Sequence, residues 1–145
     1  MEPQVMRRLV AAARVGRLAT VAGDGRPHLV PVCFALRGDT VYTAVDHKPK
    51  RTSRLRRIAN LAQTGWATVL VDEYAEDWST LWWVRLDGSG RVLGDRSDAA
   101  AEEAAAAVAA LVAKYPQYRA QPPAGPVIAV DIGRWTGWSA RPAQR

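Results

Sequence analysis

Apolar and polar residues alternate in short runs through the first third of the chain, and glycine-containing turns separate these runs. The alternation predicts strands over residues 17–22, 27–36 and 40–45. The sequences between them, Gly-Asp-Gly at 23–25 and Arg-Gly-Asp at 37–39, are typical of tight hairpin turns. Strands joined by such turns pair antiparallel, so this region predicts a three-stranded meander.

The same alternation returns after residue 65 and predicts a second group of strands. An acidic loop at 72–77 follows the first of them, and Gly-Ser-Gly at 88–90 is expected to separate the next two. The expected strands cover residues 66–71, 79–88, 90–93 and 127–135. The sequence after residue 135 is expected to form a tail.

Three other segments show the 3.6-residue period of a helix. They cover residues 3–15, residues from Thr52 or Ser53 to about Ala62, and an alanine-rich run from Ser97 or Asp98 to Tyr115. The third helix has acidic residues near its start and Lys114 in its last turn, as the helix dipole favours. Pro116 is expected to end it.

This order of elements predicts a single domain, residues 1–145, that is mainly β with flanking helices. An antiparallel barrel with the helices packed outside it is the natural architecture. The hydrophobic content of 48% is enough for a core of this kind. No glycine-rich turn of the dinucleotide-binding type joins a predicted strand to a predicted helix.

The net charge of +6 and the sequence pI near 10.1 favour an anionic partner. Cys33 is the single cysteine, so no intrachain disulfide can form and a cytoplasmic location is expected. No apolar run approaches the roughly 20 residues of a membrane span, and no membrane association is expected. Nucleic acid is an unlikely partner because no binding motif for it appears.

Residues 46–57, DHKPKRTSRLRR, concentrate positive charge at the start of the second predicted helix. Cations there oppose the helix dipole, which prefers anions at a helix N-terminus. A bound phosphate would remove this conflict, because side-chain charge, hydroxyls and the first backbone N–H groups would all attract it. The alternative is a solvated helix face. On the phosphate hypothesis, the contacts come from Lys48, Lys50, Arg51 and Thr52.

Six tryptophans are present, and core packing is the default interpretation for each of them. Trp82 and Trp83 are adjacent on a predicted strand, so their side chains face opposite ways. Trp138 lies in the expected tail and is harder to explain as a core residue, which suggests a contact between subunits. Groups for acid–base catalysis are scarce, a composition that is compatible with a redox cofactor carrying its own chemistry.

Four segments together resemble the flavin and deazaflavin oxidoreductases of the pyridoxamine-phosphate-oxidase-like split-barrel superfamily, and most of all their coenzyme-F420-dependent branch. The segments are RLATVAGDGRPHLVPVCF (17–34), DHKPKRTSRLRRIANL (46–61), VDEYAEDWSTLWWVRLDG (71–88) and GRWTGWSA (133–140). They occur in family order and span nearly the whole chain. The second and third are the more specific to the F420 type.

The resemblance implies a split β-barrel that forms a homodimer, with cofactor sites at the interface. It assigns the cofactor phosphate to the loop after the third strand, in the first part of the segment 46–57, and the cofactor ring to the second strand and the end of the third. Trp138 would reach over from the partner chain. The residues so implicated in cofactor binding are Pro31, Val32, Cys33, Ala44, Val45, Lys48, Lys50, Arg51, Thr52 and Trp138.

The implied activity is hydride transfer from reduced F420 to a small organic acceptor that the sequence does not identify. Arg54, Arg56 and Arg57 would suit the carboxylate-rich tail of F420, although they are equally compatible with plain solvation. FMN, in a reductase or oxidase of the same fold, is the alternative cofactor. A non-catalytic F420 carrier is the alternative function. No match to the substrate-phosphate residues of the true pyridoxamine phosphate oxidases is found, which argues against oxidation of vitamin B6.

Overall fold

The computed structural model describes residues 1–45, 51–94 and 98–141, with the backbone alone for residues 51–55. Its strands form one seven-stranded antiparallel sheet in the order β2-β1-β5-β6-β7-β4-β3. The strands are β1 (Gly16–Val21), β2 (Pro27–Val32), β3 (Ala35–Arg37), β4 (Thr40–Ala44), β5 (Trp66–Glu73), β6 (Trp82–Leu93) and β7 (Val127–Ser139). The helices are α1 (Pro3–Ala12), α2 (Arg51–Gln63), α3 (Asp98–Lys114), α4 (Pro116–Ala120) and the 3-10 turn η1 (Trp78–Thr80).

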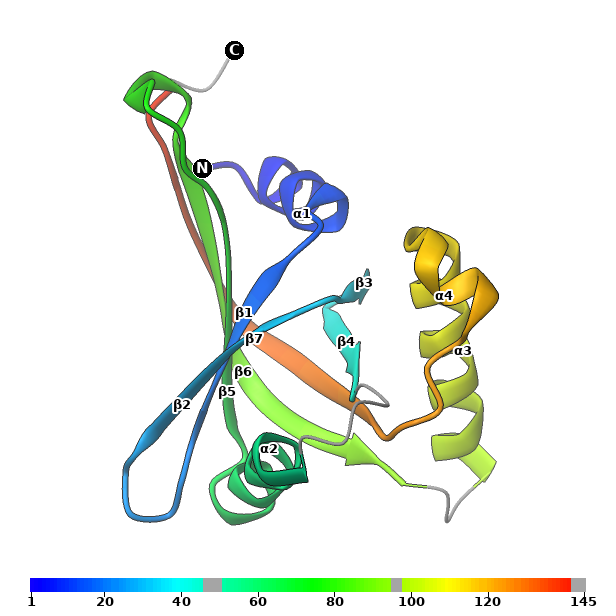
Figure 1. Ribbon diagram of the computed structural model, residues 1–145. Coiled ribbons are helices and arrows are strands. Elements are labelled where there is room, and N and C mark those ends of the chain that lie inside the picture. The colour runs from blue at the N-terminus through cyan, green and yellow to red at the C-terminus, as the bar shows by residue number, and fades with distance from the viewer. Residues whose placement is uncertain (46–50, 95–97, 142–145) are drawn as a thin grey trace.

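The sheet coils strongly and forms a half-barrel with the helices outside it (Figure 1). Helix α2 packs against β1, β5 and β6 at one end, whereas α1 contacts β3 and β7. Helix α3 lies against β3, β4, β6 and β7, and α4 packs on α3. The prediction of a mainly β protein with flanking helices is therefore confirmed.

Alternation along the strands sorts side chains between the core and the outer face. On β1, Leu18 and Thr20 are buried while their neighbours are partly exposed. On β5, Val69 and Val71 are buried in the same way and join the main apolar cluster. This is the period-2 pattern from which the strands were predicted.

The expected single strand over residues 27–36 is divided into β2 and β3. At the break, the N–H of Phe34 donates to the hydroxyl of Tyr115 rather than to a neighbouring strand. The carbonyl of Phe34 accepts from the side chains of Lys114 and Tyr115. Side chains from the end of α3 thus replace the strand ladder at this point, and the chain can change direction.

The expected division between strands at 79–88 and 90–93 was wrong, because residues 82–93 form the continuous strand β6, and residues 79 and 80 belong to η1 instead. The sheet register shifts between Asp87 and Gly88, which marks a β-bulge opposite β7. A Cβ atom on Gly88 would collide with the backbone of Asp131. One on Gly90 would collide with Leu61 of α2. These glycines permit close approach of neighbouring segments and do not form a turn.

The expected tail also differs, since residues 136–139 extend β7 and pair with the long strand β6. Strand β5 continues to Glu73, so the acidic loop is shorter than predicted, and η1 follows it. Pro116 ends α3 as expected but also begins α4. The Arg-Gly-Asp turn is confirmed: Gly38 adopts φ of 59°, a value that favours glycine, between the paired residues Arg37 and Thr40.

Candidate functional site

A cavity of about 210 Å³ lies where β2 and β4 end, beside α2 and α4. It is lined by Val15, Pro31, Val32, Cys33, Thr43, Ala44, Arg57 and Tyr118. Four of these, Pro31, Val32, Cys33 and Ala44, are residues for which the sequence predicts contact with a cofactor ring. The structure therefore brings most of the predicted ring site together in one place.

The two strand ends are held together by a hydrogen bond within the cavity wall. Thr43 Oγ1 donates to the carbonyl oxygen of Cys33 over 2.7 Å, and Thr43 is only 3% exposed. Cys33 itself is exposed, whereas the preceding Val32 is 7% exposed and packs in the core. The alternation along β2 presents Pro31 outward and anchors the strand through Val32, and Cys33, the residue after the strand, continues the alternation outward.

The C-terminal end of α3 supports this wall from behind. The hydroxyl of Tyr115 lies 3.0 Å from the backbone nitrogen of Phe34, from which it accepts a hydrogen bond. It lies 3.0 and 3.1 Å from the carbonyl oxygens of Arg14 and Phe34, to which it can donate. Lys114 Nζ donates to the Phe34 carbonyl over 2.9 Å and lies 3.9 Å from the centre of the Phe34 ring.

Burial behind the cavity wall shifts the pKa values of Lys114 and Tyr115. It lowers the pKa of Lys114 to about 8, and the nearby Arg14 guanidinium adds to the effect. Burial also raises the pKa of Tyr115, so its hydroxyl stays protonated at neutral pH and keeps its donor proton. A neutral tyrosine hydroxyl can therefore hold the Cys33–Phe34 junction over the physiological range.

Arg57 supplies positive charge to the cavity wall and comes from the segment whose role the sequence left open. The neighbouring Arg56 lines a different cavity, on the side of α2 that faces the β1–β2 hairpin. The two arginines are therefore divided between two sites. The side chain of Arg54 lies outside the described part of the structure.

The predicted phosphate contacts fall mainly outside the described residues. Lys48 and Lys50 belong to residues 46–50, which the structure does not describe. Helix α2 begins at Arg51, earlier than the predicted start at Thr52 or Ser53, so Arg51 and Thr52 both lie in its first turn. Only their backbone is described. The phosphate assignment stays a prediction.

Two further predicted residues lie away from the cavity lining. Val45 is 1% exposed and belongs to the main apolar core. Trp138 lies on β7, paired with Trp83 of β6, at the end of the sheet remote from α2. Any contact between Trp138 and this cavity would have to come from a second chain, as the sequence analysis expects.

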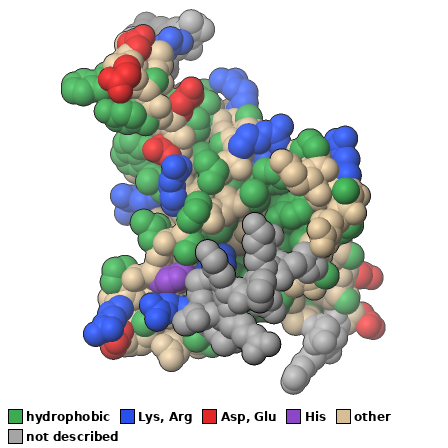
Figure 2. Space-filling view, viewed as in Figure 1, with side chains coloured by type: hydrophobic (Ala, Val, Ile, Leu, Met, Phe, Trp, Pro, Cys, Tyr) green, Lys and Arg blue, Asp and Glu red, His purple; other side chains and the backbone are tan. Residues whose placement is uncertain are grey.

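Aromatic side chains gather at this remote end, which we call the aromatic arm and define by Tyr74, Trp78, Trp82, Trp83 and Trp138. Tyr74 and Trp78 are 70% and 68% exposed, and Trp138 is 48% exposed. Figure 2 shows hydrophobic side chains projecting from this end of the molecule at the upper left. Core packing holds in part for Trp82 and Trp135, which are partly buried and pack against the main apolar cluster. It was wrong for Trp66, Trp78 and Trp138, which are exposed.

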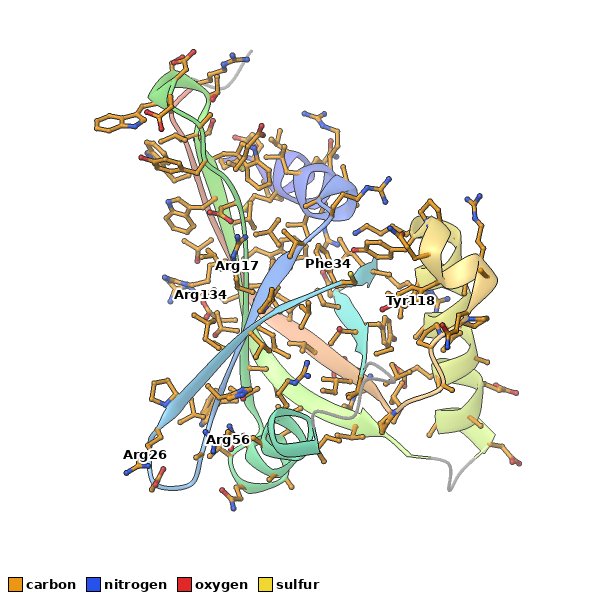
Figure 3. The ribbon with its side chains drawn as sticks, viewed as in Figure 1. Arg17, Arg26, Phe34, Arg56, Tyr118 and Arg134 are labelled. Atoms are coloured by element: carbon orange, nitrogen blue, oxygen red, sulfur yellow. The ribbon has the colours of Figure 1, made fainter. Side chains whose placement is uncertain are left out.

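Sequence reasoning missed Val15, Thr43 and Tyr118 as lining residues. Thr43 was detectable in principle, because it neighbours Ala44 at the end of a predicted strand. Tyr118 was not, because α4 was not predicted; Figure 3 shows it between α4 and the strands. No group of three or more metal-ligating side chains occurs in the described residues, and no described helix is long and apolar enough to cross a membrane.

Comparisons with known proteins agree on the fold. Residues 3–139 match the family model of pyridoxamine 5'-phosphate oxidase. A FAD-binding protein of Mesorhizobium loti is 21% identical, with a TM-score of 0.71 over 94% of this chain and 94% of that chain. A FAD-binding protein of Mycobacterium smegmatis is 18% identical, with a TM-score of 0.63 over 95% and 96%.

The heme storage protein HutZ of Vibrio cholerae is also similar, at 14% identity and a TM-score of 0.67 over 95% of this chain and 93% of that chain. At these identities the similarity shows a common fold and leaves the ligand of this chain open. No curated protein sequence matches the chain.

Proposed function

Because the chain belongs to the pyridoxamine 5'-phosphate oxidase family, we propose that the cavity beside Cys33 binds the ring of a flavin-type cofactor, and that this cofactor is coenzyme F420. The observation that carries the proposal is the convergence of Pro31, Val32, Cys33 and Ala44 on one cavity. The resemblance to the split-barrel superfamily implies the same four residues as ring contacts. Their convergence supports the ring site.

The lining suits the ring and one anionic group. Pro31, Val32 and Ala44 offer apolar contact to a flat ring, while the hydroxyl of Tyr118 and the thiol of Cys33 offer polar contact. Arg57 adds a cation that can bind a phosphate or carboxylate. The volume of about 210 Å³ is below the usual range for a whole cofactor. We therefore assign only the ring to this cavity.

The rest of the cofactor would lie along the first part of the cationic segment, residues 46–52. Strand β4 ends at Ala44 in the cavity wall, and α2 begins at Arg51 only a few residues later. Only a few residues thus connect the cavity wall to Lys48, Lys50, Arg51 and Thr52. These residues would bind a phosphate that lies beside the ring. Side-chain charge and the N-terminus of α2 would act on it together.

The reduced deazaflavin would supply a hydride from its C5 position to an electron-poor double bond, and a proton would complete the reduction. The chain's own contribution would be to bind and orient. Pro31 and Val32 would hold one side of the ring, and the bond from Thr43 to Cys33 would keep that wall in place. On this proposal, the protein is an oxidoreductase that reduces a small organic acceptor.

A homodimer would complete the site. The cavity is too small to enclose a cofactor, and the aromatic arm exposes Tyr74, Trp78 and Trp138. Large apolar surfaces of this kind usually mark an interface. We propose that the arm packs on a second copy of the chain and brings Trp138 toward its cavity.

Two alternatives have specific support. The similar structures from Mesorhizobium loti and Mycobacterium smegmatis are named FAD-binding proteins, which favours a flavin such as FMN in place of F420. The similar structure from Vibrio cholerae is named a heme storage protein, which shows that this fold can serve storage. A carrier that binds F420 without turnover is therefore the alternative to an enzyme.

Side-by-side titration of the purified chain with F420 and FMN, followed by fluorescence, tests the proposal. We expect saturable F420 binding that weakens about tenfold or more in Lys50→Ala and Arg57→Gln, because each change removes a charge-assisted contact. Arg8→Gln removes an exposed charge on α1 and is the matched control. Absence of saturable F420 binding at micromolar protein would refute the assignment.

Preferential FMN binding would instead identify the flavin alternative. Oxidation of reduced F420 across a panel of acceptors separates the enzyme from the carrier, since a carrier shows tight binding with no turnover. Light scattering of the eluted chain gives its mass. A monomer at the concentrations used for binding would contradict the shared site.

A further inference from the structure

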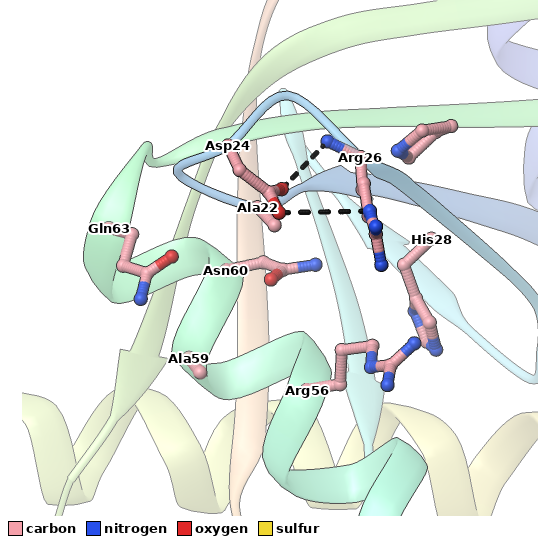
Figure 4. Close-up of a pocket in the computed structure, with 9 residues that line it drawn as sticks. Ala22, Asp24, Arg26, His28, Arg56, Ala59, Asn60 and Gln63 are labelled. Carbon is pink, nitrogen blue, oxygen red and sulfur yellow. Dashed lines mark hydrogen bonds and ion pairs between the residues drawn. The ribbon is translucent and has the colours of Figure 1, made fainter.

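A second and larger cavity, of about 420 Å³, lies between the β1–β2 hairpin and α2. It is lined by Ala22, Asp24, Arg26, Pro27, His28, Arg56, Ala59, Asn60 and Gln63 (Figure 4). None of these residues lines the cavity beside Cys33. The larger cavity is therefore a distinct place in the fold, separated from the smaller one by the α2 segment that carries Arg56 and Arg57.

The walls of this cavity are fixed by hydrogen bonds between α2 and the hairpin. Asn60 Nδ2 donates to Thr20 Oγ1 over 3.1 Å, and the two residues are 3% and 0% exposed. Gln63 Oε1 accepts from the backbone N–H of Gly23 over 2.9 Å. Thr64 Oγ1 donates to the carbonyl of Val21 over 2.9 Å. These three bonds hold the C-terminal end of α2 against the hairpin and fix one end of the cavity.

Positive charge predominates on its lining. Arg26 and Arg56 contribute two guanidiniums, and Asp24 is the single carboxylate. Arg26 Nε lies 3.7 Å from Asp24 Oδ2, so that pair is loose and largely in solvent. Arg56 and His28 lie next to each other in Figure 4. Figure 2 shows a histidine beside Lys and Arg side chains at the lower left.

The side chain of His28 also lines this cavity. Its Nδ1 atom is buried and has no hydrogen-bond partner among the described residues. Burial lowers the pKa of the imidazole, and the charges of Arg57 and Arg56 lower it further. The described charged groups around it are these two arginines on α2 and Arg26 and Asp24 on the hairpin. The site therefore disfavours one more cation and would favour an anion.

We propose that this cavity is a second binding site, separate from the cofactor site, for a small doubly charged oxyanion such as a phosphate, a sulfate or a short dicarboxylate. Guanidinium groups match the geometry of such anions, and the amides of Asn60 and Gln63 add polar lining. The cavity volume is within the range of small-molecule sites. The proposal is independent of the identity of the cofactor.

Anion binding at this site is coupled to proton uptake by His28. A dianion beside the imidazole offsets the repulsion from Arg56 and Arg57 and favours the charged form of the ring. By linkage, the protonated protein binds the anion more tightly. Affinity should therefore rise as the pH falls from 8 to 6, by at most about tenfold per pH unit for one linked proton.

Titration with sodium sulfate, at constant ionic strength set with sodium chloride, tests the proposal. Sulfate stays doubly charged over this pH range, so any pH dependence comes from the protein. The readout is the NMR signal of the His28 ring, assigned with a His47→Gln variant. We expect saturable shifts, an affinity that rises toward pH 6, and a rise in the His28 pKa when sulfate is bound.

Variants separate a built site from general attraction to a basic protein. Arg56→Gln should weaken sulfate binding about threefold to tenfold, whereas Arg8→Gln, which removes an exposed charge on α1, should leave it within about twofold. In His28→Gln, the side-chain amide signals of Asn60 and Gln63 replace the His28 ring as the readout, and the pH dependence of binding should be lost. Shifts that grow linearly with sulfate, or equal losses in Arg56→Gln and Arg8→Gln, would overturn the proposal.

A parallel F420 titration of Arg56→Gln tests whether the two sites are separate. Unchanged F420 affinity is the expected result. If Arg56→Gln weakens F420 and sulfate binding equally, the cavity holds part of the cofactor and the claim of a separate site is wrong. Because sulfate binding is measured without cofactor, a failure of the F420 assignment leaves this test intact.

Discussion

The hydroxyl of Tyr115 is a single group on which the wall of the proposed cofactor cavity depends, and Tyr115→Phe removes it alone. Tyr115 is 6% exposed, and its ring packs edge-on against Tyr118 with centroids 5.8 Å apart. Phenylalanine would keep this ring packing. The substitution therefore isolates the hydrogen bonds that join the end of α3 to the junction of β2 and β3.

The main cost falls on the backbone N–H of Phe34, which donates to this hydroxyl over 3.0 Å. Phe34 is fully buried, so its N–H would be left without a partner. A buried donor without a partner costs about 1–3 kcal/mol. The Phe34 carbonyl still accepts from Lys114, so we count only the donor and expect a loss of about 2 kcal/mol. For a chain of this size, that lowers the melting temperature by about 6 °C.

Urea unfolding measures the loss of stability, and hydrogen exchange of the Phe34 amide locates it. Tyr74→Phe is the matched control, because Tyr74 is 70% exposed and should change stability by less than about 0.5 kcal/mol. Equal stability of the Tyr115→Phe and Tyr74→Phe proteins would refute the reasoning. Unchanged protection of the Phe34 amide in Tyr115→Phe would refute it as well.

Two further predictions concern the sheet. Gly88→Ala should lower the free energy of unfolding by about 2 kcal/mol or more in urea, because its Cβ would collide with the Asp131 backbone at the bulge. Ser89→Ala, at the next and exposed position, is the control and should be nearly neutral. Arg91 bonds Glu103 and Asp131 over 2.7 Å and thereby holds the pKa of both carboxyls below their usual range. A carboxyl whose pKa is lowered by folding stabilises the protein at a pH above its pKa in the unfolded chain, about 4. This stabilisation is lost as the pH falls through the lower pKa of the folded state. The stability gap between wild type and Arg91→Gln should therefore be larger at pH 7 than at pH 3, and a gap that stays constant would show that Arg91 acts by packing alone.

Strand periodicity was the most reliable signal in this sequence because it arises from local chemistry. The alternation in residues 17–22 and the turn at Gly38 each follow from side chains a few positions apart, and both were confirmed. The Gly-Ser-Gly at 88–90 was wrongly interpreted as a break between two strands, because a local pattern does not show contacts with distant residues. Glycine is common in turns, but here it permits close approach to Asp131 and Leu61, which are distant in sequence.

The candidate site was predictable only where a local pattern or the resemblance pointed to it. Pro31, Val32, Cys33 and Ala44 were named from the sequence and lie on one cavity. Tyr118 could not be named, because it reaches the cavity through packing of α4 that no local pattern encodes.

The sequence by itself determined the class of fold, the main helices and strands, and the excess of positive charge near the start of α2. These properties depend on local periodicity, turn residues and composition, which are readable along the chain. Only the tertiary structure decided how that charge is divided, with Arg57 in one cavity and Arg56 in another. Adjacent residues on a helix point about 100° apart. Which surface each one faces depends on strands that come from elsewhere in the chain.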